Sequence, residues 1–449
     1  ATFAILLKSA KVYPAIWSKN WLPNVYEMPE SEEFSTQEIK DFLGDKGTNY
    51  LEELETALCL MKQAKNLGSV MKLTLSEEAR TFIEQRFITL KTAEFRDFTL
   101  EFIYQKIKNY IPVLLILTKK YTSVVANPPY MGQKSMNVDL KNYVNANYPL
   151  TKSDLFAVFM EVALAMNIDN GLMGMINQHS WMFLSSYQKL REHILKNFGI
   201  VNMLHLGART FEELSGEVVQ STAFVLKNGS DIEKGTYYRL TDYKKVNEKE
   251  AYFLNRNNEF SNIPQTNFYK IPGSPIAYWL TRKILGSFFK YRIENEFISK
   301  AGIVSGNDSI LLRGWYELSF NEISFNESTY KREKSVVWVP INKGGSFRKY
   351  YGNNEQVINI WNIWTEGKTT NSVRRGAKDY YYKEAVTWSM VSSKKASFRF
   401  SKNKVFNVAA PAIFTEDELK IKIVLGFLNS SVVSNILPAL NPTLNILTG

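Results

Sequence analysis

A short run that ends in two prolines places the tightest constraint on how this chain can fold. Ser123 to Ala126 is a run of small and β-branched residues, typical of a buried strand. Asn127-Pro128-Pro129-Tyr130 follows at once, and consecutive prolines cannot continue a central strand because they have no N–H to donate. Ligands of open α/β sheets bind at the carboxyl ends of strands. We therefore expect the Asn127 amide, two backbone carbonyls of this motif and the Tyr130 ring to lie at the ligand-binding edge of the sheet.

Hydrophobic periodicity on both sides of this run predicts alternating strands and helices. We expect strands near 171–176, 201–206 and 221–226, and helices after the capping sequence Thr151–Asp154 and over 185–198. A polar loop is expected over 132–150. Upstream, we expect helices over 1–11 (buried), from 51, over 76–88, and over 97–119 unless Pro112 breaks the last one. The alternation implies an α/β fold with a mostly parallel sheet.

The excess of positive over negative charge lies entirely in the C-terminal half of the chain. Residues 1–236 hold 25 Lys and Arg against 26 Asp and Glu, whereas residues 237–449 hold 30 against 18. In the second half, basic residues alternate with aromatic and amide residues, which suits phosphate and base contacts. The candidate DNA-binding residues there are Lys343, Arg348, Lys349, Arg374, Arg375 and Arg399. A merely basic surface is the alternative explanation.

Composition argues against several other classes of protein. The longest apolar run, Ile111 to Leu117, is too short to span a bilayer, so no membrane partner is expected. The single cysteine, Cys59, excludes an intrachain disulfide and favours a reducing, cytoplasmic setting; we expect it on a helix, facing the protein core. Three histidines without ligand spacing argue against a metal site.

Residues 127–130 resemble the Asn-Pro-Pro-Tyr motif of S-adenosylmethionine-dependent amino-group methyltransferases, above all the DNA adenine-N6 enzymes. The resemblance covers about residues 121–227. It implies a Rossmann-like core in which Asn127, Pro128, Pro129 and Tyr130 are catalytic and Phe211 contacts a base flipped out of the duplex. It also implies that Asp154, Phe156 and Phe159 bind S-adenosylmethionine, although an aromatic such as Phe159 at helical spacing is as often a core residue.

Further segments extend the resemblance to nearly the whole chain. With Lys152–Phe156, Gly207–Arg209, Asn342–Gly345 and Leu440–Asn445, it resembles the adenine-specific DNA methyltransferases of BREX phage-defence systems. That implies methylation of host double-stranded DNA, with other proteins of the defence system as partners. It also implies a catalytic domain over 1–236, with a helical insertion at about 45–119, followed by an α+β target-recognition domain over 237–449.

One departure from that family stands out. Its glycine-rich cofactor loop and the acidic residue that follows normally precede the Asn-Pro-Pro-Tyr strand, and no such pattern is present here. We therefore expect a fragment, incomplete at the N-terminus and truncated at the C-terminus. Alone, it is expected to bind S-adenosylmethionine weakly or not at all and to methylate no DNA.

Two other functions fit parts of the sequence. The same motif serves guanine and glutamine nitrogens, so an RNA or protein amide methyltransferase is one alternative; the basic second half argues against it. A DNA-recognition module without its own activity is the other. A strand that simply ends in a Pro-Pro turn would carry no chemistry at all.

Overall fold

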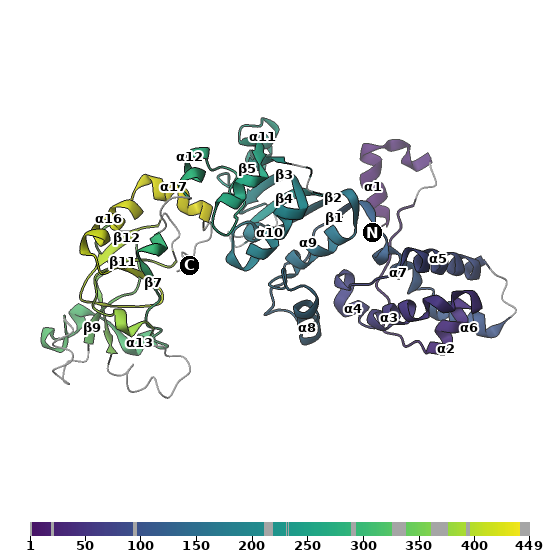
Figure 1. Ribbon diagram of the computed structural model, residues 1–449, viewed down its shortest axis with the longest axis horizontal. Coiled ribbons are helices and arrows are strands. Elements are labelled where there is room, and N and C mark those ends of the chain that lie inside the picture. The colour runs from purple at the N-terminus through teal and green to yellow at the C-terminus, as the bar shows by residue number, and fades with distance from the viewer. Residues whose placement is uncertain are drawn as a thin grey trace. The chain divides into compact units, whose positions relative to one another are not determined.

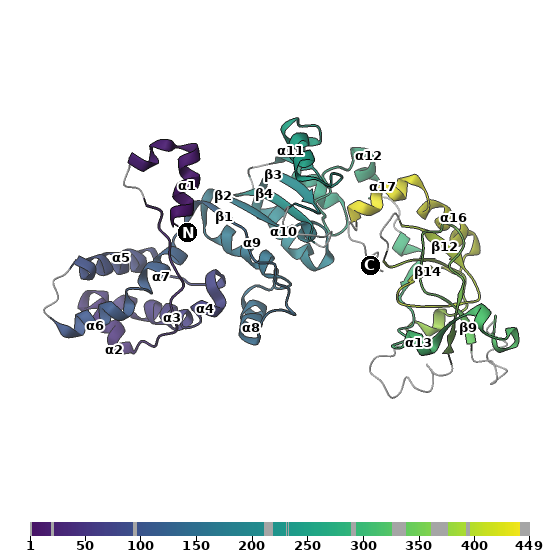
Figure 2. The ribbon, with the colours of Figure 1, turned by 180° about the vertical axis from the view of Figure 1, so that it is seen from behind.

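The computed structural model describes residues 2–18, 22–92, 97–210, 219–229, 231, 233–288, 293–325, 338–360, 376–391 and 396–440 (Figure 1). The chain forms two compact units. The first unit contains residues 1–181 and 192–265, and the second contains 182–191 and 266–449. Figure 2 shows the same elements from behind.

Helices fill the N-terminal part of the first unit. They are α1 (Thr2–Val12), α2 (Thr36–Leu43), α3 (Leu51–Met61), α4 (Ala64–Leu67), α5 (Glu77–Thr92), α6 (Phe98–Ile107) and α7 (Ile111–Thr118). Pro112 lies in the first turn of α7, where its missing N–H costs nothing, and it separates α7 from α6. Buried apolar side chains of helices α2 through α7 form one cluster with those of α8 (Val138–Asn147) and α9 (Leu155–Ala165).

A six-stranded sheet with the order β1-β2-β4-β3-β5-β6 forms the rest of the first unit. Its strands are β1 (Tyr121–Ala126), β2 (Asn167–Gln178), β3 (Phe198–Gly207), β4 (Ser221–Asn228), β5 (Lys234–Arg239) and β6 (Glu259–Pro264). Helices α10 (Gln188–Asn197) and α11 (Val246–Leu254) complete the βα alternation. The fold is thus mixed α/β, as the sequence pattern indicates.

The direction of the strands corrects the expectation of a mostly parallel sheet. β1 pairs with β2, and β3 with β5, in parallel, but β4 runs antiparallel to both β2 and β3, and β6 runs antiparallel to β5. β4 is the next strand along the chain after β3, and the short link of residues 208–220 brings it back beside β3 in the opposite direction, whereas a parallel neighbour usually requires a longer crossover connection. The balance of charged residues changes after residue 236, but the six-stranded sheet continues beyond that point and includes β5 and β6.

Several local expectations are also corrected. The strand at 121–126 forms, but at the edge of the sheet, so that Val125 is 83% exposed rather than buried. Helix α1 forms but buries none of its residues, and Cys59 is exposed. Helix α8 occupies the expected loop, and the cap of α9 is Asp154 rather than Thr151.

The second unit is built from two four-stranded sheets and short helices. The strand orders are β13-β9-β10-β8 and β12-β11-β14-β7. Its strands are β7 (Ile298–Lys300), β8 (Leu312–Gly314), β9 (Trp338–Asn342), β10 (Gln356–Asn359), β11 (Ala385–Trp388), β12 (Phe398–Ser401), β13 (Val405–Phe406) and β14 (Ala412–Phe414). Its helices are α12 (Arg282–Ser287), α13 (Asp308–Leu311), α16 (Glu418–Leu428) and α17 (Ser431–Leu440).

No single helix in the described ranges has the length and apolar content needed to cross a membrane. Glu418–Leu428 and Ser431–Leu437 meet that criterion only jointly, with a 68° bend between them.

Two buried histidines meet where β2 and β3 end. Nδ1 of His179 lies 2.7 Å from Nε2 of His205, so one ring must donate and the other accept. Burial lowers the pKa of His179 to about 4. Burial, and then the charges of His179, Arg239 and Lys249, hold the pKa of His205 well below its usual value. Both rings are therefore neutral in the folded protein at neutral pH.

This pair predicts that acid lowers the free energy of unfolding. An unfolded histidine titrates near ~6.5, so between about pH 6.5 and 4 the unfolded chain takes up protons that the folded chain refuses. His179 alone contributes up to ~3 kcal/mol of loss across that window. Urea unfolding at a series of pH values is the measurement. His179→Gln should flatten the pH dependence of the free energy of unfolding. A wild-type stability that does not change with pH in this window would contradict the prediction.

Candidate functional site

Three strands bring their carboxyl ends to one edge of the six-stranded sheet. β1, β2 and β3 run in the same direction and end at Ala126, Gln178 and Gly207. The antiparallel β4 begins at that edge, where Ser221 pairs with both Gln178 and Gly207. Segments from distant parts of the chain thus converge on the place where the Asn-Pro-Pro-Tyr motif leaves β1.

The four motif residues differ in how they are placed. Asn127 and Pro129 are exposed, Pro128 is buried, and Tyr130 is partly buried. The Tyr130 ring meets Phe156 edge-on, with ring centroids 6.2 Å apart and an interplanar angle of 82°. Phe156 is fully buried, so it acts here as a fixed wall for Tyr130. The motif therefore presents an amide on the surface beside a braced aromatic ring.

The carboxylate of Asp154 connects this motif to helix α9. Its Oδ1 accepts hydrogen bonds from the backbone N–H groups of Met131 (2.9 Å) and Phe156 (3.2 Å). The N–H of Leu155 in turn donates to the carbonyl of Met131 at 3.0 Å. Burial raises the pKa of Asp154, and the backbone donors partly offset that rise. Asp154 is one of the residues expected to bind the cofactor. Its Oδ1 atom fixes the backbone at Met131, after the motif, and also caps the N-terminus of α9.

A second polar feature lies at the same edge. The hydroxyl oxygens of Tyr130 and Ser221 are buried, and neither makes a hydrogen bond of standard geometry within the described part of the chain. Burial raises the pKa of Tyr130, an effect that the nearby Ser221 hydroxyl slightly offsets. Buried polar groups usually have partners, so these two hydroxyls mark a place that a polar ligand or water can complete.

Lys249 fixes the chain that leaves β3. Its ammonium donates to the carbonyl of Leu206 at 2.6 Å and to that of Ala208, and it is almost completely buried. Burial lowers the pKa of Lys249. Sequence reasoning missed this residue, because a lysine on a polar helix gives no sign that it turns inward. Phe211, the expected base-contacting residue, follows β3 in the sequence but lies outside the described residues.

Phe159, expected at the cofactor, is partly buried and packs against the apolar cluster of α2 to α9. This contact gives it a role in the core, and contact with a cofactor remains a prediction.

The expected DNA-binding cations of the second unit have other contacts. Lys343 pairs with Asp308, and the Lys349 ammonium donates to the Asn429 carbonyl at 2.6 Å, at the end of α16. Arg348 is exposed and lies 3.9 Å from Glu355. Arg399 is only 1% exposed and bonds to Ser389 and Ser397, a placement that does not fit contact with DNA. Arg374 and Arg375 lie outside the described residues.

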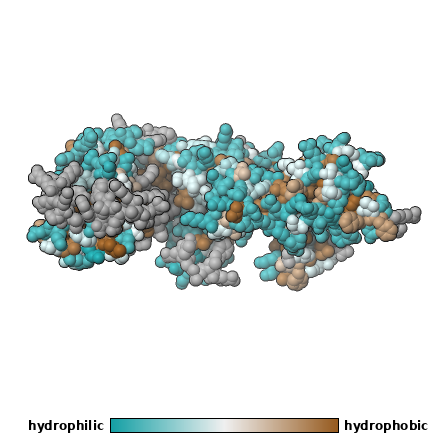
Figure 3. Space-filling view, turned by 90° about the horizontal axis from the view of Figure 1, so that it is seen from below, coloured by the Kyte–Doolittle hydropathy of each residue, from teal (hydrophilic) through white to brown (hydrophobic). Residues whose placement is uncertain are grey.

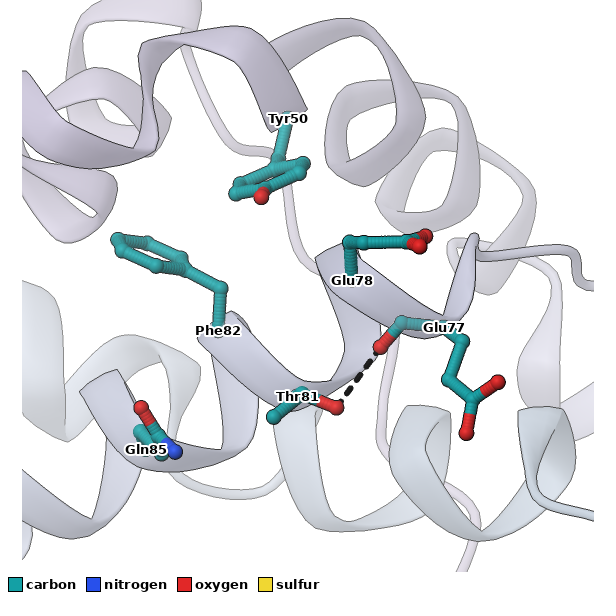
Figure 4. Close-up of a pocket in the computed structure, with 6 residues that line it drawn as sticks. All are labelled: Tyr50, Glu77, Glu78, Thr81, Phe82 and Gln85. Carbon is teal, nitrogen blue, oxygen red and sulfur yellow. Dashed lines mark hydrogen bonds between the residues drawn. The ribbon is translucent and has the colours of Figure 1, made fainter.

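A hollow of about 380 Å³ lies in the helical part of the first unit (Figure 4). It is lined by Tyr50, Glu77, Glu78, Thr81, Phe82 and Gln85, and the Thr81 hydroxyl donates to the Glu77 carbonyl at 2.8 Å. None of these residues belongs to the sheet edge, and two carboxylates disfavour phosphate. Elsewhere, Figure 3 shows hydrophilic residues over most of its face, with hydrophobic residues in small patches.

Comparison with known proteins relates the chain to restriction-modification enzymes. Residues 19–211 match the family described as Eco57I restriction-modification methylase. A solved structure, the Type IIL restriction-modification enzyme MmeI in complex with DNA, aligns over 87% of this chain and 56% of that chain, with 13% identity and a TM-score of 0.43. That structural likeness is too low to support more.

Two curated relatives are considerably more similar in sequence. The adenine-specific methyltransferase PglX of Lacticaseibacillus casei (strain Zhang) is 37% identical over 100% of this chain. The adenine-specific methyltransferase BrxX of Escherichia coli O9:H4 (strain HS) is 40% identical over 88% of it. The chain spans 38% and 32% of the lengths of these relatives. It is therefore a homologue of the PglX and BrxX adenine-specific methyltransferases and carries a segment of the Eco57I restriction-modification methylase family.

Proposed function

We propose that this chain belongs to a site-specific DNA methyltransferase that moves a methyl group from S-adenosylmethionine to N6 of adenine. Its role is to mark host DNA in the cytoplasm as part of a BREX-type phage-defence system. The first unit carries a Rossmann-like catalytic core, and the second unit recognises the target. The observation that carries the proposal is the braced Asn-Pro-Pro-Tyr motif at the carboxyl edge of the sheet, in a chain 37–40% identical to adenine-specific methyltransferases.

The motif is suited to activating a poor nucleophile. The lone pair of an exocyclic adenine nitrogen is delocalised into the ring. The exposed Asn127 side-chain oxygen and the Pro128 carbonyl accept hydrogen bonds from that amine, which shifts electron density to nitrogen and aims its lone pair. The Pro128-Pro129 pair fixes the direction of these acceptors because each ring locks its own φ. Tyr130, braced by Phe156, stacks on the base once it has left the duplex.

The residues present fit the methyl-donor end of the cofactor. S-adenosylmethionine supplies an electrophilic methyl group when bound. Asn127 and Tyr130 lie at the sheet edge where ligands of such folds bind, and the buried Tyr130 and Ser221 hydroxyls there make no hydrogen bond of standard geometry in the described residues. Phe159 and the remaining oxygen of Asp154 are the other candidates for contact.

Two alternatives are separated by one assay. Labelled methyl groups from S-adenosylmethionine should enter duplex DNA, but neither RNA nor protein, when the full-length gene product is supplied with all three. Incorporation into RNA or protein would favour an amide methyltransferase. Binding of DNA without incorporation would favour a recognition module.

Asn127 is predicted to act mainly in the chemical step. In the full-length gene product, Asn127→Ala removes an acceptor used in the transition state, so kcat should fall by at least ~100-fold while DNA affinity changes little. Asn127→Asp keeps acceptor oxygens and should retain more activity than Asn127→Ala. The control is Asn24→Ala, an exposed asparagine in an irregular segment. Wild-type turnover by Asn127→Ala would show that the catalytic assignment is wrong.

Two variants of Tyr130 distinguish the contribution of its ring from that of its hydroxyl group. Tyr130→Ala loses base stacking and should weaken transition-state binding by about 1–3 kcal/mol. Tyr130→Phe keeps the ring and removes only the hydroxyl, so it should retain base stacking and lose at most about 1 kcal/mol from a missing polar contact with the ligand. Steady-state kinetics and thermal unfolding of both variants are the measurements. Equal losses in the two variants would contradict a stacking role.

DNA affinity should fall steeply as the salt concentration rises, because the second half of the chain carries the net positive charge that would neutralise DNA phosphates. Arg348→Ala should reduce the slope of log affinity against log salt by about one. Lys349→Ala, by contrast, should lower the melting temperature because its ammonium stabilises the end of α16. Fluorescence anisotropy with duplex DNA tests both, and an affinity independent of salt would count against backbone contacts.

A further inference from the structure

One edge of the sheet β13-β9-β10-β8 gathers several loops of the second unit. β10 runs antiparallel to both β8 and β9, so the ends of β8 and β9 lie beside the start of β10. Residues 315–317, which follow β8, and residues 343–355, which connect β9 to β10, therefore emerge at the same edge. A hydrogen bond from the Trp315 N–H to the Glu355 carbonyl, 3.0 Å long, joins the two segments.

Aromatic side chains at this edge face solvent instead of the core. Tyr351 is 70% exposed and Tyr350 52% exposed. Phe347, Trp315 and Tyr316 are also exposed, and Trp315 and Tyr316 meet edge to face. We call these five residues the aromatic edge. Such a gathering of exposed aromatic rings usually marks a contact surface.

The backbone of this loop is held in a strained conformation. Tyr350 has a φ of +68°, in the left-handed region that costs energy for a residue with a bulky side chain, whereas Asn353, with a φ of +58°, belongs to a type that tolerates this region. Gly352 has φ of +132°, and a Cβ there would lie 2.5 Å from Cδ of Arg348. Strain of this kind persists only when surrounding contacts impose it, and it is common at binding sites.

Those contacts are present on both sides of the loop. The Asn353 side chain donates to the Ser346 carbonyl at 2.9 Å, which closes the loop at its base. The N–H and carbonyl of Tyr350 bond to Phe398 and Phe400 of β12, each at 2.8 Å. Lys349 is tied to Asn429. The backbone is thus fixed while the rings of Phe347, Tyr350 and Tyr351 point into solvent, a preorganised arrangement typical of recognition loops.

We propose that the aromatic edge, with Arg348, is a double-stranded DNA-contacting surface in which the aromatic rings supply the sequence-dependent contacts and Arg348 supplies a phosphate contact. The proposal deepens the function proposed above and rests on it. Charge decides the class of partner, since residues 237–449 hold 30 Lys and Arg against 18 Asp and Glu and complement a polyanion. It also relocates recognition from Lys343, Lys349 and Arg399, whose side chains are occupied within the unit, to the rings beside them.

The test uses the full-length gene product and two variants. Tyr351→Ala removes one ring. Tyr350→Gly removes another while keeping a residue that adopts positive φ readily, so the loop is not strained further. The control is Tyr26→Ala, a tyrosine of similar exposure in the first unit. Binding is measured on a duplex that carries the host sequence found methylated by sequencing, and on a scrambled duplex of the same composition.

Both variants should bind the site-bearing duplex roughly ten-fold more weakly, the scale of losing recognition at one base pair of a specific duplex site. Binding to the scrambled duplex, the salt slope and the melting temperature should stay as in the wild type, and the control should change nothing. Wild-type affinity of both variants, or equal losses on both duplexes, would overturn the proposal. Retained DNA binding with lost capture of another protein would show a protein-binding surface instead. A wild-type protein that binds no duplex at low salt would contradict the proposed function itself, and this surface with it.

Discussion

The carboxylate of Asp154 is the contact on which the arrangement of the candidate site depends. The two prolines of the motif fix the direction of the chain only as far as Tyr130. Beyond that residue, the hydrogen bond from Met131 to Asp154 determines where the chain goes, and the bond from Phe156 starts α9 at the same point. A cap of this kind contributes about 1 kcal/mol to a helix. Here it also places Phe156 against the ring of Tyr130.

The position of β4 adds a further polar residue to the carboxyl edge of the sheet. Because β4 lies antiparallel between β2 and β3, it begins where they end, and it brings Ser221 to the carboxyl edge. The buried pair of His179 and His205 and the inward-turned Lys249 then fix the end of β3. The site is therefore formed by residues from several separate places in the sequence, held by backbone pairing and by a few buried polar contacts.

In the second unit, basic residues serve structural as well as electrostatic purposes. A lysine near the end of a helix is attracted to its last carbonyls, and a buried arginine needs hydrogen-bond acceptors; Lys349 and Arg399 show these two cases. An aromatic ring left exposed on a rigid loop has no comparable structural use. This contrast is why the charge balance of residues 237–449 indicates only the class of partner, while the proposed contact residues are taken mainly from the exposed aromatic side chains.

The sequence by itself determined the local elements and the motif. The strand before Asn127, the break at Pro112, the α/β alternation and the helix that carries Phe156 all follow from periodicity and from the backbone limits of proline, which act within a few residues. It could not determine that β4 would return antiparallel, that Val125 and Cys59 would be exposed, or that Arg399 would be buried, because each depends on which elements pack together. Burial and hydrogen-bond partners are properties of the assembled fold, so only the tertiary structure decided which charged and aromatic residues remain available to a ligand.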